Sequence, residues 1–355
     1  MKTQKVLVAA ALLLMTGAGC LGGSATKSAT GGVWSTANGG KSWTAMNVLP
    51  TASAVSSIGS VDVLSLTRDP SDEKVLYAGT KASGLLYSLD GGLSWQRPPE
   101  GDAFTVVRSG SVLDVAVDPK DPCTYYVLKT DRLLKTVTCG RSFDDSYVET
   151  RTDEKLTALA LDWYNAKNVW VGNTAGDVLR STDAGANWAA VDRVKDDVSA
   201  IEVSNADSRV VVVGTLRNSV FRTTDGGATW NTLEKDFQTF AQADRVHGFA
   251  QSADGKTLVL SSDYGIFRST DNGGTWQPLS LVTAHGEVKI YAVGVAPKDG
   301  NTIVYGTDST FYRSTSGGSS WNTEELPTSR AASAILFSNT DASSLLLGVQ
   351  AIEKK

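Results

Sequence analysis

The chain has 355 residues, of which 41% are hydrophobic and 20% are charged, so it can bury a large core. Its formal net charge of −5, without a long basic run, argues against a nucleic-acid partner. The sequence holds no metal-ligand motif, phosphate loop or dinucleotide fingerprint, so we predict no metal and no cofactor.

The first twenty residues have the pattern of an export signal. Lys2 and Lys5 precede an apolar run at 6–15 that is too short to span a membrane, and small residues follow it. Cys20 then stands where a bacterial lipobox, which this segment resembles, has its lipidated cysteine, although Gly17 replaces the usual leucine. We expect a lipoprotein-type signal peptide at 1–20 and a lipid anchor on Cys20. An ordinary secretory signal with a stray cysteine is the alternative.

Residues 21–31 are rich in Gly, Ser, Thr and Ala, a composition that predicts a flexible tether. Residues 351–355 are predicted to form a charged tail. Together with the signal, this organisation predicts an exported protein held at the cell envelope by its anchor in the lipid bilayer, on the periplasmic or cell-surface side.

An eight-residue pattern that ends in an aromatic residue occurs seven times, at a period of about 45 residues. In the copy Ser269–Trp276, a hydroxyl and an acid can bind the backbone N–H groups of a tight turn, and a glycine supplies a positive φ. The aromatic residue then begins a strand and buries its ring. The third and last positions of the seven copies are Asn38 and Trp43, Asp90 and Trp95, Thr138 and Phe143, Asp183 and Trp188, Asp225 and Trp230, Asp271 and Trp276, and Ser316 and Trp321.

These octets resemble the Asp-boxes, or BNR repeats, of sialidases, sortilin-type receptors, xyloglucanases and photosystem II assembly factors. The box occurs in proteins of unrelated activity, so the resemblance implies a hairpin corner of a scaffold and not a functional site.

Each repeat contains four short strands bounded by turn residues, as at 62–67, 75–79, 85–88 and from Trp95 onward. Residues 331–350 supply two strands without a box, whereas residues 32–48 supply a third strand, a box and a fourth strand. We therefore predict an all-β, seven-bladed β-propeller of four-stranded blades at 32–350. One shared blade pairs N-terminal with C-terminal strands and closes the ring.

Beyond Cys20 the chain has two cysteines, Cys123 and Cys139, and both fall in one repeat. In an exported chain this even remainder favours a disulfide at one end of that blade. Two buried free thiols are the alternative.

Catalysis is not expected. The chain has no Arg-Ile-Pro motif and seven predicted blades where sialidases have six, and it has the length for one propeller where xyloglucanases use two. Its two histidines, His247 and His285, lie in no catalytic motif. We predict no catalytic residue, and a degenerate glycoside hydrolase of either kind remains the alternative.

A cation precedes the box in five successive repeats. Because these residues follow the structural period, we expect their long side chains to cover strand edges and to keep their charges in water. An anion-binding stripe is the alternative. The residues are Lys135, Arg180, Arg222, Arg268 and Arg313.

The loops on the face opposite the Asp-boxes differ most in length and sequence, and binding sites usually lie on such loops. Arginine and tyrosine also anchor many interfaces. Acids are interspersed, so an ordinary solvated surface is the alternative. The candidates for partner binding are Arg97, Arg108, Arg132, Arg217, Arg245 and His247, and the same loops hold Arg151, Tyr147, Tyr264 and His285.

In size, boxes and lipoprotein signal the chain resembles most the photosystem II stability and assembly factor family. That resemblance implies a non-catalytic, membrane-anchored scaffold that binds a protein partner, in the manner of an assembly factor for a membrane protein complex. A glycan-binding propeller with Tyr147 and Tyr264 in its site is the competing hypothesis, and a structural surface protein without a defined ligand is the third.

Overall fold

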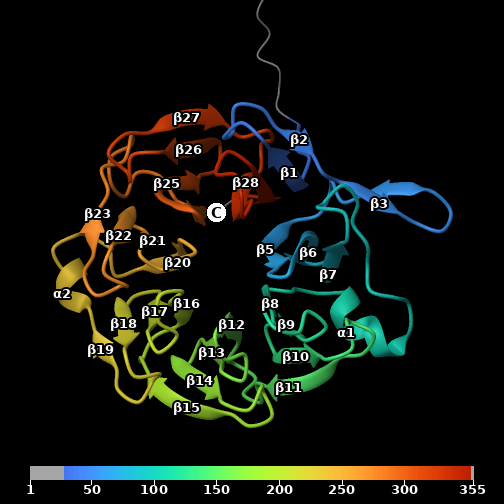
Figure 1. Ribbon diagram of the computed structural model, residues 1–355, viewed down its shortest axis with the longest axis horizontal. Coiled ribbons are helices and arrows are strands. Elements are labelled where there is room, and N and C mark those ends of the chain that lie inside the picture. The colour runs from blue at the N-terminus through green and yellow to red at the C-terminus, as the bar shows by residue number, and fades with distance from the viewer. Residues whose placement is uncertain (1–27, 353–355) are drawn as a thin grey trace, which may run out of the picture.

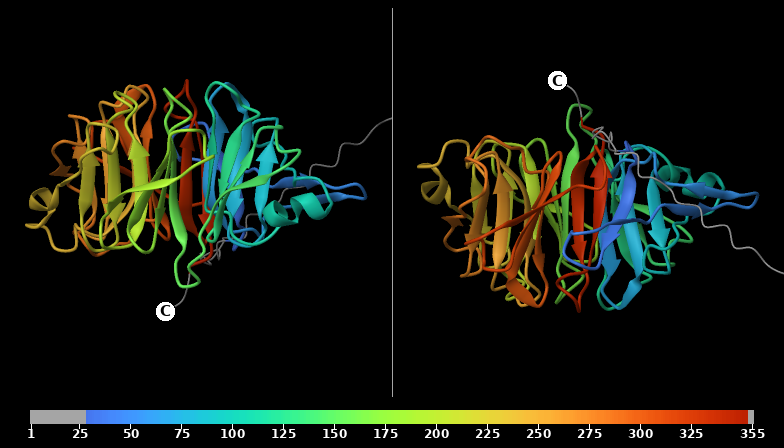
Figure 2. Two further views of the ribbon diagram at one scale, coloured as in Figure 1. Left: turned by 90° about the horizontal axis from the view of Figure 1, so that it is seen from below. Right: turned by 90° about the horizontal axis from the view of Figure 1, so that it is seen from above.

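The computed structural model describes residues 28–352 and shows a ring of seven sheets around a central axis (Figure 1). Seen edge-on, the strands run across the thickness of the ring and their connections gather at its two faces (Figure 2). The only helices in these residues are η1 (Asp102–Phe104), α1 (Thr105–Arg108) and α2 (Glu234–Phe237). None of them has the length and hydrophobicity that a membrane crossing needs. The predicted all-β, seven-bladed propeller is confirmed.

Five blades consist of four consecutive antiparallel strands, ordered from the axis outward. They are β8 (Asp114–Val117), β9 (Tyr125–Leu128), β10 (Arg132–Thr136) and β11 (Asp144–Val148); β12 (Leu156–Leu161), β13 (Val169–Asn173), β14 (Asp177–Ser181) and β15 (Ala189–Arg193); β16 (Val198–Val203), β17 (Val211–Thr215), β18 (Val220–Thr223) and β19 (Asn231–Thr232); β20 (Val246–Gln251), β21 (Leu258–Ser262), β22 (Ile266–Ser269) and β23 (Gln277–Pro278); and β24 (Ala292–Ala296), β25 (Asp299–Gly306), β26 (Thr310–Ser314) and β27 (Asn322–Glu325).

The two ends of the chain share one blade. Its sheet has the order β2-β1-β29-β28, in which β1 (Gly32–Thr36) and β2 (Thr44–Ala45) come from the N-terminal side, and β28 (Ala331–Phe337) and β29 (Leu345–Gln350) from the C-terminal side. β1 and β29 pair along the whole of β1, from Gly32 opposite Val349 to Thr36 opposite Leu345. The predicted closure is therefore confirmed.

The blade that follows the shared one departs from the repeat. Its sheet contains β5 (Val63–Asp69), β6 (Asp72–Thr80) and β7 (Leu85–Ser88), and the predicted fourth strand is reduced to one bridge between Tyr87 and Gln96. Pro98 and Pro99 follow, and proline has no N–H to extend the ladder. A hairpin of β3 (Val48–Pro50) and β4 (Val55–Ser57), which the sequence analysis did not predict, projects outward from the ring (Figure 1).

The core lies between neighbouring blades. One cluster joins Val178 and Trp170 of one blade to Val198, Val211 and Val213 of the next, and all five are buried. Full burial of a valine or leucine side chain contributes about 1.5–3 kcal/mol. The stability of the ring therefore rests largely on the faces between blades.

Part of the predicted tether is fixed in place. The Thr328 hydroxyl donates to the carbonyls of Ser28 and Thr30 at 2.9 and 2.7 Å, and Arg330 Nε donates to the Ala29 carbonyl at 2.8 Å. Residues 28–31 thus lie along the connection between β27 and β28. The predicted signal peptide, with Cys20, the rest of the tether and positions 353–355 of the tail lie outside the described residues.

Candidate functional site

Each Asp-box is a closed hydrogen-bonded turn. In the first complete repeat, the buried Ser88 hydroxyl accepts from Gly92 N and donates to Asp90 Oδ1, both at 2.8 Å. Asp90 Oδ1 also accepts from Ser94 N at 2.8 Å. These acids are occupied within their own turns, as a structural role requires.

Hydrogen bonds also set the ionisation of the box acids. The pKa values of Asp183 and Asp225 are lowered to about 2, first by hydrogen bonds from the Asn187 and Thr229 side chains and then by the backbone N–H groups of the same residues. A proton donor at neutral pH needs a raised pKa. These carboxylates therefore do not suit general acid catalysis.

The cations before the boxes join neighbouring blades. Four of them donate to the carbonyl directly after the third box position of the next blade: Lys135 Nζ to Ala184 at 2.8 Å, Arg180 Nη1 to Gly226 at 2.5 Å, Arg222 Nε to Asn272 at 3.1 Å and Arg268 Nη1 to Gly317 at 3.3 Å. Arg313 Nη2 donates instead to Ala342 at 3.3 Å. These contacts explain why the cations follow the repeat.

A disulfide joins Cys123 and Cys139, which lie in two connections at one end of a single blade. The backbone of the same pair is hydrogen bonded, Cys139 N to Cys123 O at 3.0 Å. The bridge closes the turn in which Thr138 and Phe143 replace the usual Asp and Trp.

The face opposite the Asp-boxes, here called the loop-rich face, is formed by the turns between second and third strands and by the connections between blades. The strand order places all six partner-binding candidates on it, and five of them lie beside carboxylates. The pairs are Arg108 with Glu100 at 3.3 Å, Arg132 with Asp131 at 3.0 Å and Asp145 at 3.1 Å, Arg217 with Asp196 at 3.1 Å, Arg245 with Asp263 at 3.5 Å, and His247 with Asp263 at 2.6 Å.

Arg97, the sixth candidate, donates from Nη1 to the Ser83 carbonyl at 2.9 Å. The two tyrosines of the glycan hypothesis are engaged as well. The Tyr264 ring stacks on His285 with centroids 4.1 Å apart, and the Tyr147 ring meets Trp188 edge-on at 5.7 Å. The loop-rich face therefore holds its arginines in fixed positions and has a mixed charge.

An ion-pair network that sequence analysis missed joins two blades on this face. Arg151 contacts Glu149 at 2.7 Å and Asp177 at 2.9 Å, and Arg193 contacts Asp177 at 2.6 Å. Asn173 Nδ2 lies between the two buried carboxylates, 3.2 Å from Glu149 and 3.3 Å from Asp177. The Arg151 hydrogen bonds lower the pKa of Glu149, so the acid stays ionised. Arg151 follows β11 and Asp177 lies in the next blade, so no local pattern in the sequence indicates that they meet.

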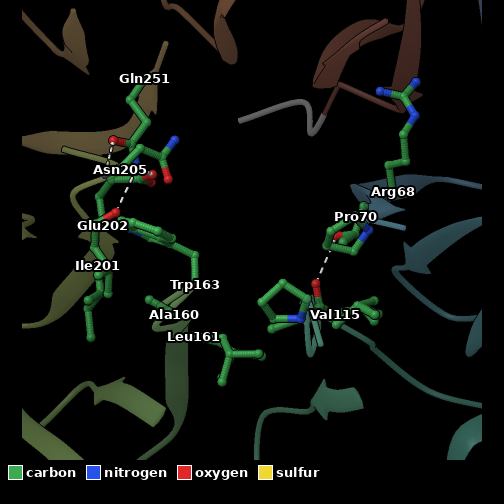
Figure 3. Close-up of a pocket in the computed structure, with 16 residues that line it drawn as sticks. Arg68, Pro70, Val115, Ala160, Leu161, Trp163, Ile201, Glu202, Asn205 and Gln251 are labelled. Carbon is green, nitrogen blue, oxygen red and sulfur yellow. Dashed lines mark hydrogen bonds between the residues drawn. The ribbon is translucent and has the colours of Figure 1, made fainter. Parts of the chain in front are cut away.

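The Asp-box face has a hollow at the central axis (Figure 3). One part has a volume of about 440 Å³ and an adjoining part about 720 Å³, and the ends of the inner strands and their turns line both. Arg68 lies across the hollow from Glu202 and Gln251 (Figure 3). Trp163, 40% exposed, stands at its rim and donates from Nε1 to the Ser204 carbonyl at 2.8 Å.

Glu202 is the unusual acid of this hollow. Burial raises its pKa to about 7, a hydrogen bond from Gln251 Nε2 opposes that shift, and the Asp114 carboxylate adds to it. Burial also raises the pKa of Asp114 to about 7. Across residues 28–352, no group of three or more His, Cys, Asp or Glu side chains is arranged to hold a metal ion.

Solved structures share this architecture. The chain is similar to the GH74 xyloglucanase from Xanthomonas campestris, with 18% identity and a TM-score of 0.65 over 81% of this chain, but it spans only 51% of that enzyme. It is similar to YCF48 from Cyanidioschyzon merolae, with 14% identity and a TM-score of 0.61, over 81% of this chain and 95% of that one. YCF48 bound to a D1 peptide shows 16% identity and a TM-score of 0.59, over 83% and 94% of the two chains. At these identities the likeness shows the fold alone.

No curated protein sequence matches the chain. A family profile does: that of the photosynthesis system II assembly factor YCF48 matches residues 104–300, which is more than half of the chain. The matched segment runs from η1 to β25 and covers four complete blades. With its boxes, its seven blades and this match, the chain belongs to the YCF48 family of photosystem II assembly factors.

Proposed function

We propose that this protein is a non-catalytic scaffold that holds a protein partner while a membrane complex is assembled. The observation that carries the proposal is the family match over residues 104–300. A YCF48 structure of the same fold contains a D1 peptide, which supports a protein segment as the ligand. The occupied box acids and their low pKa values are consistent with a role without catalysis.

We further propose that the partner binds the loop-rich face. Its arginines are held by carboxylates yet keep exposed area: the side chains of Arg217 and Arg245 are 66% and 45% exposed. A guanidinium already fixed in position loses less side-chain entropy when a partner contacts it. The alternation of positive and negative groups suits a polar segment of mixed charge.

The third part of the proposal is location. The lipobox-like segment would place a lipid on Cys20, and residues 21–27 would connect the anchor to the first residues that contact the ring. A lipid anchor would keep the scaffold at the membrane where its client is assembled.

Crosslinking followed by affinity purification tests the function. The tagged protein would be recovered from gently solubilised membranes, and the proteins that accompany it identified. We expect stoichiometric subunits of one membrane complex. The Cys20→Ser variant should leave the membrane fraction and lose those subunits, whereas recovery of the protein alone from the wild type would contradict the scaffold role.

Two triple variants that each remove three positive charges test whether the partner binds the loop-rich face. Arg108→Gln, Arg217→Gln and Arg245→Gln together should weaken partner binding at least tenfold, because interface arginines contribute strongly. The control removes three cations from turns on the Asp-box face, with Lys120→Gln, Arg209→Gln and Lys256→Gln. Equal binding by both triple variants would place the interface elsewhere, and circular dichroism would verify that both are folded.

A further inference from the structure

A second cavity lies between the blade of β5–β7 and the blade of β8–β11, on the side of the Asp-boxes. Its volume is about 410 Å³, within the range of small-ligand sites. Tyr77, Tyr87 and Tyr125 line it together with Pro98, Pro99 and Pro122. The disulfide, Cys123–Cys139, forms part of its wall.

The cavity exists because two features of the repeat are missing at one place. In three boxes the indole N–H crosses to the preceding blade: Trp95 to the Met46 carbonyl at 2.8 Å, Trp188 to Ser146 at 2.9 Å and Trp321 to Ser280 at 2.8 Å. Met46 and Ser146 each lie three residues beyond the aromatic residue of their own box.

For the box that ends in Phe143, the corresponding residue is Pro98, three residues beyond Trp95, and Pro98 lines the cavity. Its carbonyl accepts from Arg108 Nη1 in place of an indole N–H. Phe143 is smaller than tryptophan and has no N–H. The fourth strand that would cover this position is also absent, because Pro98 and Pro99 replace it. The space that an indole and an edge strand fill elsewhere is therefore open here.

The walls select a neutral aromatic ring. The two charged side chains of the lining are opposite in sign, and each is bound within its own turn: Asp69 Oδ1 accepts from Ser71 N and Oγ at 2.7 Å, and Arg141 Nε donates to the Thr138 carbonyl at 2.9 Å. Tyrosine rings favour stacked or edge-on contact with another ring. Tyr77 and Tyr125 make no hydrogen bond through their hydroxyls to any other residue of 28–352, so polar atoms remain for a ligand.

We propose that this cavity binds a compact, neutral aromatic ring with one polar atom, of the indole or phenol class. The ring belongs either to a free small molecule or to a tryptophan or tyrosine side chain of another protein. The proposal does not rest on the function proposed above, because it is argued from the lining of the cavity and not from the family match. The two sites share one segment: Pro98 and Pro99 belong to the connection that carries Arg108, and Arg108 Nη1 donates to the Pro98 carbonyl.

Methyl NMR of the purified protein tests the site. Indole and 4-methylphenol would be titrated while the methyl signals of two lining residues, Val75 and Leu89, are followed. We expect saturable shifts with a Kd on the order of 0.1–1 mM, as suits ligands of so few atoms. Phe143→Trp should fill the cavity and weaken binding at least tenfold.

A second pair of variants covers the case in which Phe143→Trp does not fold. Leu89 and Leu93 lie in the same turn and are 55% and 65% exposed, but only Leu89 lines the cavity. Leu89→Lys should weaken binding about tenfold, because it places a charge at the mouth of an apolar site, whereas Leu93→Lys should bind as the wild type does.

The source of the ring is distinguished by competition. If a short uncharged peptide with one tryptophan displaces indole and its alanine counterpart does not, the site takes a protein side chain. If neither peptide displaces indole, the site takes a free molecule. The proposal is overturned if no saturable shift occurs, or if Phe143→Trp and Leu89→Lys both bind as well as the wild type.

Discussion

At the scale of single residues, the third position of the Asp-box supplies an acceptor oxygen, whether that oxygen belongs to a carboxylate or to a neutral side chain. Asp225 Oδ1 accepts from the backbone N–H four residues later at 2.9 Å. Asn38 Oδ1, Thr138 Oγ1 and Ser316 Oγ accept from the equivalent N–H at 3.0, 3.0 and 2.9 Å. A neutral oxygen thus closes the turn as well as a carboxylate does, which explains why the position varies.

This equivalence predicts a graded effect at Asp90. Asp90→Ser keeps an acceptor for Ser94 N and should lower the free energy of unfolding by less than about 0.5 kcal/mol. Asp90→Ala removes the acceptor and should cost about 1–2 kcal/mol, the usual range for hydrogen bonds of a polar turn. Urea denaturation of the two variants measures the difference. Equal losses would show that the charge, and not the acceptor, matters.

Glu202 makes stability depend on pH in the opposite sense from an ordinary salt bridge. Its pKa is about 7 in the folded protein, against the ordinary value of 4.5 for a glutamate, because burial disfavours its charge. Between pH 4.5 and about pH 7, the Glu202 carboxyl has lost its proton in the unfolded chain but keeps it in the folded protein. The contribution of this group to stability therefore falls as pH rises from about 4.5 to 7 and is constant above that.

Glu202→Gln should remove this dependence while keeping an acceptor for Gln251. We expect the variant to match the wild type near pH 4.5 and to be more stable by about 1–3 kcal/mol at pH 8, since one pKa unit corresponds to about 1.4 kcal/mol. Denaturation at both pH values tests this, with Glu234→Gln, at an exposed position of α2, as the control for loss of a carboxylate. A difference of the same size at both pH values would contradict the raised pKa.

At the scale of elements, the inner strands and the boxes follow the sequence closely because each is a local pattern. The predicted inner strand at 62–67 corresponds to β5 at 63–69, and the predicted third strand at 85–88 coincides with β7. The hairpin of β3 and β4 was missed, because its ten residues contain no long alternating pattern. In the blade after the shared one, Pro98 and Pro99 end the predicted fourth strand after one bridge.

The sequence was sufficient to predict on which face of the ring the candidate residues lie. Antiparallel order decides which connections share a face, so the six partner-binding candidates could be grouped without coordinates. Which acid meets which arginine could not be read from the sequence, because Arg217 meets Asp196 across 21 positions and Arg151 meets Asp177 across 26. The aromatic cavity depends likewise on Pro98 and Phe143, which are distant in the chain.

The disulfide stabilises the blade in which the box is weakest. It closes a segment with a sequence separation of 16, and a loop of this length contributes about 3 kcal/mol in the chain-entropy account. Cys123→Ser with Cys139→Ser should therefore lower the free energy of unfolding by about 2–3 kcal/mol. Urea denaturation measures the loss, and reduction of the wild type should reproduce it. No effect from either change would show that the hydrogen-bonded turn is sufficient.

At the scale of the whole molecule, the shared blade determines how the ring closes. Main-chain pairing between β1 and β29 holds the two ends of the chain, in addition to the side-chain contacts that join other neighbouring blades. Opening the ring at this point breaks a sheet. Opening it between two blades that are each continuous in sequence would separate side-chain contacts and isolated hydrogen bonds, such as Ala253 N to Pro297 O, but no strand ladder. We infer that the shared blade makes the unfolding of the ring cooperative.

Two circular permutants separate these cases. Gly32 lies opposite Val349, so a short turn from Gln350 to Gly32 would join β29 to β1 as a hairpin. Both permutants would contain this turn and would lack residues 1–31. New termini between Lys195 and Asp196 fall between two blades and leave no blade shared. New termini between Arg217 and Asn218 divide the blade of β16–β19. Its strands β18 and β19 then come from the new N-terminal end and β16 and β17 from the new C-terminal end, so one blade is again shared between the two ends of the chain.

We expect both permutants to fold, because every strand pairing is retained. The permutant with termini between Lys195 and Asp196 should open between the blades of β12–β15 and β16–β19. The amides of β13 and β17 should then exchange hydrogen faster than global unfolding allows, and the denaturation transition should broaden. The second should retain uniform protection and a single sharp transition. Equal protection in both would mean that side-chain packing between blades closes the ring as firmly as a shared sheet does, and that the interleaved ends contribute nothing to cooperativity.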